Sequence, residues 1–249
     1  MTNFPPNLQV IRGLMGCCFL LREGGQCVMI DTGMWGEPVF IRRAFRRWGL
    51  APNSLQAILL THGHLDHAGN LAWLKDWSGA KVFGHPNEQR HVNGTYPYRG
   101  VNRWCGRLES LGRKAFRYRP TLIDEPLHDG QILPWWGGLE VMHLPGHTLG
   151  HCGFFSAQHD LLFSGDMFAS YFFNTHRPAA ILNSAPEQLE VSAAKIRARK
   201  PRWIIPNHFD FQNADLHRRR FTKLYGFADW IPAEPTASDG STLICSSRR

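Results

Sequence analysis

Residues Thr61 to Gly69 read "THGHLDHAG". It places three histidines and an aspartate within six positions, directly after the apolar run "AILL" at 57–60. Burying such groups costs free energy unless they are paired or coordinate a metal. We therefore expect a metal site at the end of a buried strand.

The spacing within this stretch suits two metals. Side chains alternate along a strand, so we expect His62 and His64 on one side, with Gly63 leaving room for the backbone. Asp66 and His67 follow as the chain turns into a helix. A catalytic zinc takes three protein ligands and keeps one position open, and two adjacent metals need two such sets. The pattern predicts His62 and His64 for one metal, and Asp66 and His67 for the other.

Residue types that bind metals also follow three further expected strands. His147 lies in a Gly-rich turn just beyond a strand, in "LPGHTLGH" at 144–151. Asp166 and His208 end the apolar segments "LLFSGD" at 161–166 and "IIPNH" at 204–208. A carboxylate at a strand end is costly to bury alone, but between two cations it is a natural bridge. Four strand ends with ligand-type side chains favour one composite site.

The alternation of short apolar runs and amphipathic segments predicts a layered α/β fold. We expect strands at 8–12, 17–22, 26–31, 56–61, 80–85, 139–144, 151–156, 160–166 and 202–206, and helices at 37–48, 68–77, 184–199 and 213–227. The third of these helices should begin at "SAPE", 184–187, a capping box. Residues 85–130 lack periodicity and are predicted to be a partly helical insertion that shapes a binding site.

Composition excludes several classes of protein. Of the 249 residues, 43% are hydrophobic and 19% charged, enough for a sizeable core. The net charge is +8, but the arginines at 42–47 alternate with apolar residues, as on the wet face of a helix, so nucleic-acid binding is not expected. No apolar run could cross a bilayer and the first residues have no signal-peptide pattern, so a cytoplasmic protein is expected. Six cysteines without a CxxC pair are predicted to be buried thiols.

In order along the chain, "THGHLDHAG", "PGHTLGH", "SGD" and "NH" resemble the metal-binding motifs of the metallo-β-lactamase superfamily, over about residues 8–225. The resemblance implies an αββα sandwich, two β-sheets face to face with helices outside. We expect one such domain over 1–231 and a mobile tail at 232–249.

The resemblance also implies roles for individual residues. His62, His64 and His147 would hold the first metal, and Asp66, His67 and His208 the second, with Asp166 between them. Asp66 would also orient the attacking hydroxide and carry a proton. Asp31, in "IDTG", matches an aspartate that lies behind the ligands and orients them. Tyr171 lies slightly later than the tyrosine with which related lactonases polarise the substrate carbonyl. The histidines interpreted as non-ligands are His85, His91, His128, His143, His151, His159, His176 and His217.

The predicted function is a metal-dependent hydrolase in which a hydroxide bridging two zinc ions cleaves a small ester, lactone or thioester, a lactonase being the nearest branch. Iron and manganese are alternative metals. The alternative functions are a mononuclear iron dioxygenase acting on persulfides, phosphodiester or β-lactam hydrolysis at the same site, and a non-catalytic binding protein.

The resemblance also narrows the choice among branches of the superfamily. Its true β-lactamases generally have Cys, Ser or another residue at the position of Asp166, which argues against a true β-lactamase. Only about 41 residues follow His208, too few for the glutathione-binding domain of hydroxyacylglutathione hydrolases. The expected partner is a small anionic or acyl-bearing substrate, and aromatic residues of the insertion would suit a homodimer surface.

Overall fold

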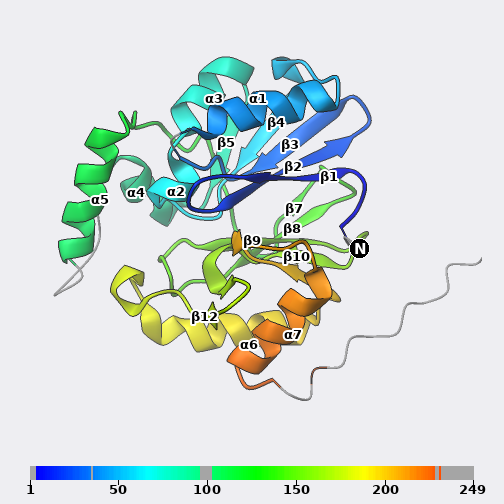
Figure 1. Ribbon diagram of the computed structural model, residues 1–249, viewed down its shortest axis with the longest axis vertical. Helices are drawn as coiled ribbons and strands as arrows, with labels where there is room; N and C mark the ends of the chain where they lie inside the picture. Colours follow the sequence, from blue (N-terminus) through cyan, green and yellow to red (C-terminus); the bar gives the residue numbers. More distant parts are fainter. Residues whose placement is uncertain (1–3, 35, 96–102, 228–229, 231–249) are drawn as a thin grey trace, which may run out of the picture.

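The first β-sheet contains six strands and is formed by the N-terminal half of the chain (Figure 1). In spatial order they are β1 (Leu8–Arg12), β2 (Cys17–Glu23), β3 (Gln26–Ile30), β4 (Leu55–Leu59), β5 (Lys81–Gly84) and β6 (Glu125–Pro126). The first three strands are antiparallel, and β3 to β6 are parallel. The computed structural model describes residues 4–34, 36–95, 103–227 and 230.

The second sheet contains five strands, and a small third sheet contains three. The second has the order β13 (Trp203–Ile205), β10 (Leu161–Phe163), β9 (Cys152–Ser156), β8 (Leu139–His143) and β7 (Ile132–Leu133). The third has the order β12 (Thr175–His176), β11 (Ala169–Ser170) and β14 (His208–Phe209). The strands that the sequence did not predict (β6, β7, β11, β12 and β14) are two residues long, too short to show a period.

Seven α-helices connect the strands. They are α1 (Glu37–Arg47), α2 (Leu65–Ala68), α3 (Leu71–Ser78), α4 (Gln89–Val92), α5 (Arg103–Ala115), α6 (Leu189–Arg199) and α7 (Ala214–Leu224) within the described ranges. Helices α1 and α3 cover the outer face of the first sheet, and α6 and α7 that of the second (Figure 1). Helix α5, in the predicted insertion, stands to one side.

Alternation along the strands produces the layers. In β2, Phe19 and Leu21 pack into the core between the two sheets, whereas Cys18 and Leu20 pack outward among the residues of α1 and α3. On the other sheet, Phe154 faces the inter-sheet core and Phe155 faces α6 and α7. Burying apolar side chains on both faces of both sheets stabilises four layers. The αββα sandwich is therefore confirmed.

The predicted capping box at 184–187 is wrong. Helix α6 begins at Leu189, after a 3₁₀ turn at Pro186–Gln188, and no side chain caps it. The reason is tertiary, because the N–H groups of Ser184 and Ala185 donate to the carbonyls of His147 and Gly146. These contacts hold the segment against the loop before β9 instead of starting a helix.

Other expectations concern composition. Cys17, Cys18, Cys27 and Cys152 are buried free thiols, as expected, whereas the side chains of Cys105 and Cys245 lie outside the described part. The arginines of α1 are exposed, and its Ile41 and Phe45 are buried. The predicted tail at 232–249 also lies outside the described residues. Within the described ranges, no helix has the length and apolarity that a membrane span requires.

Candidate metal centre

Seven predicted ligand side chains, from segments far apart in the chain, converge in one place. The donor atoms of His62, His64 and His147 lie within 4.8 Å of one another, and so do those of Asp66, His67 and His208. The structure thus brings together the same two groups that the motifs suggested.

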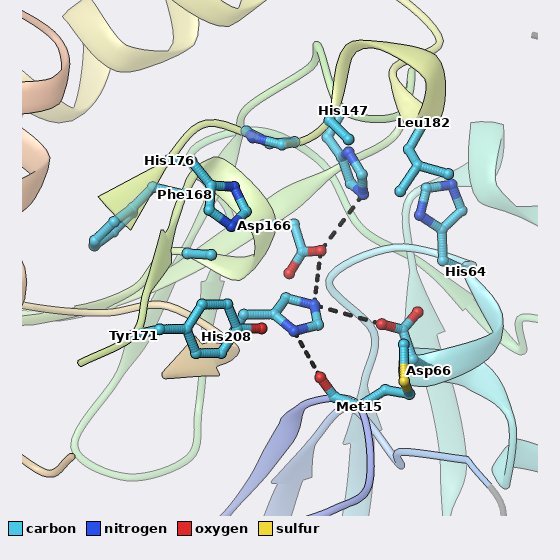
Figure 2. A pocket seen from close by; sticks show the side chains of 13 residues that line it. Met15, His64, Asp66, His147, Asp166, Phe168, Tyr171, His176, Leu182 and His208 are labelled. Atoms are coloured by element: carbon cyan, nitrogen blue, oxygen red, sulfur yellow. Dashed lines mark hydrogen bonds and ion pairs between the residues drawn. The ribbon is translucent and has the colours of Figure 1, made fainter. Parts of the chain in front are cut away.

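Asp166 lies between the two groups (Figure 2). Its Oδ2 is 3.5 Å from His147 Nε2 and 3.1 Å from His208 Nε2. Its Oδ1 is 3.3 Å from Nε2 of His67. One carboxylate can therefore serve donors of both groups, as a bridging ligand must.

Loops, not strands, deliver the first histidines. Strand β4 ends at Leu59, and His64 is the N-cap of α2. The convergence of His62 and His64, whose Nε2 and Nδ1 are 3.2 Å apart, therefore comes from a loop rather than from the strand pleat that the sequence suggested. Asp66 and His67 lie on the single turn of α2. Asp166 lies on a 3₁₀ turn after β10, and His208 begins β14.

Hydrogen bonds fix which nitrogen of His67 and His208 faces the centre. Nδ1 of His67 lies 2.9 Å from Oδ2 of Asp31, and Nδ1 of His208 lies 2.8 Å from the carbonyl oxygen of Met15. A carboxylate and a carbonyl only accept hydrogen bonds, so each Nδ1 carries the proton and donates it. In the neutral ring, Nε2 then has a lone pair aimed at Asp166, ready for a metal.

The same logic applies to His147 and His62. Nδ1 of His147 donates to Oδ1 of Asn183 over 2.9 Å. Nδ1 of His62 lies 3.1 Å from Oγ1 of Thr61, whose own proton goes to Asp31, so Thr61 is the acceptor. Four histidines are thus oriented from behind, an arrangement typical of metal ligands.

Asp31 joins several of the groups that lie behind the ligand side chains. It accepts hydrogen bonds from the main-chain N–H of Thr61 at 2.8 Å and from its hydroxyl at 2.7 Å. It also accepts from the side chains of His67 at 2.9 Å and Asn207 at 2.8 Å. Asp31 is fully buried, and its φ of 57° is unusual for a residue other than glycine. It is placed as the sequence suggested, behind the donors rather than among them.

Three buried polar atoms test whether a metal fits here. Within the described part of the chain, three ligand atoms make no hydrogen bond: His67 Nε2, His147 Nε2 and Asp166 Oδ1. Each of them lies within 3.5 Å of another potential metal-ligand atom. Without a metal ion or a proton between them, such atoms are unsatisfied, at a cost of about 1–3 kcal/mol each. Imidazole and carboxylate are ligands that zinc accepts, and a cation would satisfy all three atoms at once. The residues therefore fit a metal centre.

The charges around the second group have a consequence for the metal-free protein. Burial lowers the pKa of His67, but the carboxylates, Asp166 first, outweigh it and leave the pKa well above its usual value. The pKa of His208 is raised for the same reason. Without metal these rings hold protons, and a divalent ion would have to displace them.

We expect the metal-free protein to become less stable as the pH rises above about 6.5, the pKa of histidine in the unfolded chain. The stability that protonated His67 and His208 contribute is complete below that pH and is lost as the pH passes their raised folded-state pKa. Denaturant unfolding of chelator-treated protein between pH 6.5 and 9 checks this. A flat or rising profile would contradict it, and His208→Gln should flatten the slope.

The remaining histidines fall into four sets. His151 is buried, and its Nε2 accepts the main-chain N–H of Asp166 at 2.9 Å, so it positions that residue from behind. His91 lies with His64 and Glu109 in a third group of donors within 4.8 Å. His176 lines the cavity beside the centre. No described group of three potential ligands includes His85, His128, His143, His159 or His217.

A cavity of about 210 Å³ opens onto the donors (Figure 2). Its apolar wall consists of Met15, Phe168, Ala169, Pro178, Ala179 and Leu182. Tyr171 also lines it, and burial raises the pKa of its hydroxyl, opposed by the charge of His208. The side chain of Tyr171 can therefore contact a ligand in the cavity. Arg220 donates a hydrogen bond to the main-chain oxygen of Tyr171 and fixes the position of its backbone.

The sequence indicated Asp31 but not the other residues that position the ligands. Asn207 precedes His208 in "IIPNH" and could have been noticed there. Glu88, Asn183 and the carbonyl of Met15 belong to segments without any motif. Only the folded chain brings them to the centre.

The comparisons with known proteins agree with this geometry. The family model described as Metallo-beta-lactamase superfamily matches residues 11–208. The chain belongs to this superfamily. Its members among the solved structures include the metallo-beta-lactamase family protein TTHA1429 from Thermus thermophilus, with a TM-score of 0.71 and 22% identity over 90% of this chain and 80% of that one. At that identity the likeness shows the fold.

Other relatives are more similar in sequence. Hydroxyacylglutathione hydrolase GloC of Haemophilus influenzae is 35% identical over 61% of this chain, and the match spans 65% of GloC, slightly less than two thirds. Probable metallo-hydrolase YybB of Bacillus subtilis is 28% identical over 80% of this chain and 84% of its own. TTHA1623, crystallised in a di-iron-bound form, is 27% identical with a TM-score of 0.64, over 86% of this chain and 97% of that one.

Proposed function

We propose that this superfamily member is a hydrolase that holds two zinc ions and cleaves a small ester, lactone or thioester. The observation that carries the proposal is the position of Asp166 between two complete groups of donors, at the floor of a cavity. The similarity to GloC, named as a hydroxyacylglutathione hydrolase, supports thioester or ester cleavage. A persulfide dioxygenase would use one iron, and the second group of donors would then have no purpose.

Two divalent ions, when bound, would make hydroxide available at neutral pH and polarise a carbonyl oxygen. Of the chain's own residues, Asp66 is suited to move the proton. Its Oδ2 lies 3.4 Å from Nε2 of His208 and 3.7 Å from Nε2 of His67, and the residue remains accessible from the cavity. The carboxylate can accept a proton from the attacking water and return it to the leaving group.

Tyr171 is the candidate for holding the substrate. Because it lines the same cavity as Asp66 and Asp166, its hydroxyl can donate a hydrogen bond to the substrate carbonyl or to the leaving oxygen. Its raised pKa keeps the hydroxyl protonated for that purpose.

The cavity wall favours an apolar acyl group. None of the described lining residues is Lys or Arg, so no lysine or arginine side chain in the wall could pair with the carboxylates of a peptide-like thiol. The volume, about 210 Å³, is below the roughly 300–1,000 Å³ of sites for drug-sized ligands. We therefore expect short acyl chains to be preferred.

A chain-length series of lactones, esters and thioesters tests this proposal, with metal content measured on the same samples. We expect turnover with two zinc ions bound and a steep fall in kcat/KM for long acyl groups. Leu182→Trp places a larger side chain in the wall and reduces the space in the cavity. It should lower kcat/KM for the longest accepted substrate about tenfold or more relative to an acetyl ester. Leu122→Trp, at an exposed leucine that does not line the cavity, is the control. One bound iron with oxygen consumption would favour the dioxygenase instead.

A further inference from the structure

Glu88 is a fully buried carboxylate outside every predicted motif. It ends a short 3₁₀ turn, Pro86–Glu88, just after β5. Its Oε2 accepts the main-chain N–H of Gly63 at 2.7 Å, and its Oε1 accepts that of Gly150 at 2.8 Å. One carboxylate thus joins two main-chain segments that are far apart in the sequence.

Both segments carry potential metal ligands of the first group, which consists of His62, His64 and His147. Gly63 lies between His62 and His64, in the loop after β4 of the first sheet. Gly150 lies three residues after His147, in the loop between β8 and β9 of the second sheet. Because the two loops come from different sheets, their separation depends on what connects them. Glu88 is such a connection.

The two glycines allow the carboxylate to come this close. A Cβ at position 150 would lie 2.8 Å from Oε1 of Glu88 and 2.9 Å from its Cγ. A Cβ at position 63 would lie 3.3 Å from Oε2 of Glu88 and 2.5 Å from Cβ of His91. The absence of a side chain at the glycines of "HGH" and "LGH" therefore leaves the space that the Glu88 carboxylate occupies.

We propose that Glu88 is a positioning residue for the first metal, holding the loops of His62, His64 and His147 at the separation that coordination needs. The inference rests on the proposed metal centre. Burying a carboxylate is expensive even where main-chain N–H groups donate to it, and a rigid connection between ligand loops explains the burial of Glu88. Changes behind metal ligands typically reduce metal affinity about 10–100-fold.

The test compares Glu88→Gln with the full-length wild type. The amide keeps the shape but turns an NH₂ group toward one of the two N–H donors, so one connection is lost. We expect cobalt(II) or zinc titrations against a competing chelator to show about 10–100-fold weaker binding of one ion. The affinity of the other ion should stay close to that of the wild type.

The ratio of the two affinities separates positioning from general stability. A merely structural role would lower the midpoint of unfolding but leave this ratio unchanged, and that result would overturn the inference. Glu23→Gln is the control, because Glu23 also accepts a main-chain N–H, that of Trp136 at 2.7 Å, far from the donors. It should leave both affinities unchanged.

A second variant guards against misfolding of the first. Gly150→Ala retains the charge of Glu88 but displaces the carboxylate by steric contact, and it should also weaken one ion selectively. Equal affinities in Gly150→Ala and the wild type would contradict the inference. If the wild type itself binds no metal, the proposed function fails. If the wild type binds two ions and both variants match it, only the role of Glu88 fails.

Discussion

Replacing Asp166 with asparagine is expected to lower kcat/KM for the best ester or thioester substrate by at least about 10³-fold, which is about 4 kcal/mol. Among the described residues, its carboxylate is the group that contacts donors of both sets, with His67, His147 and His208 within 3.5 Å. An amide has no negative charge to share between two cations and turns a donor group toward one of them.

The measurement pairs steady-state kinetics with metal analysis of the same protein. Bound metal should fall from two ions to one or fewer, while the circular dichroism spectrum stays unchanged. Asp76→Asn is the matched control, because Asp76 is an exposed aspartate paired with Arg119. An Asp166→Asn protein that retained both ions and normal turnover would remove the basis of the dinuclear assignment.

The second large effect concerns stability. Asp31→Asn is expected to lower the free energy of unfolding by about 3 kcal/mol, because a buried acceptor of charged and neutral hydrogen bonds becomes partly a donor. Oδ2 alone accepts from Thr61, His67 and Asn207, and an amide nitrogen there would face all three donors. For a chain of this size, the melting temperature should fall by about 6–12 °C.

Denaturant unfolding of the metal-free protein isolates the hydrogen bonds from metal binding. Asp160→Asn is the control, since Asp160 also has a positive φ, 47°, and its side chain accepts one main-chain N–H, that of Arg202. It should cost less than about 1 kcal/mol. A loss of similar size in both variants would mean that the hydrogen-bond network of Asp31 does not govern the effect.

The segments with strong local patterns could be predicted. The strands of the two large sheets that are three or more residues long lie within three residues of their expected positions, because short apolar runs are read locally. The start of α6 could not be predicted in this way, since the N–H groups of Ser184 and Ala185 are taken by the loop of His147. A local capping signal yields to tertiary hydrogen bonds.

From its sequence alone, this chain could be placed in a fold and given a set of donor residues, because ligand types at strand ends are visible one segment at a time. The folded chain alone fixes which nitrogen faces the centre in His62, His67, His147 and His208. Their Nδ1 atoms are held by Thr61, Asp31, Asn183 and Met15, in that order. It alone also placed Glu88 against Gly63 and Gly150, residues 25 and 62 positions away. Such contacts join segments without a shared local pattern, so they exist only once the two sheets have packed.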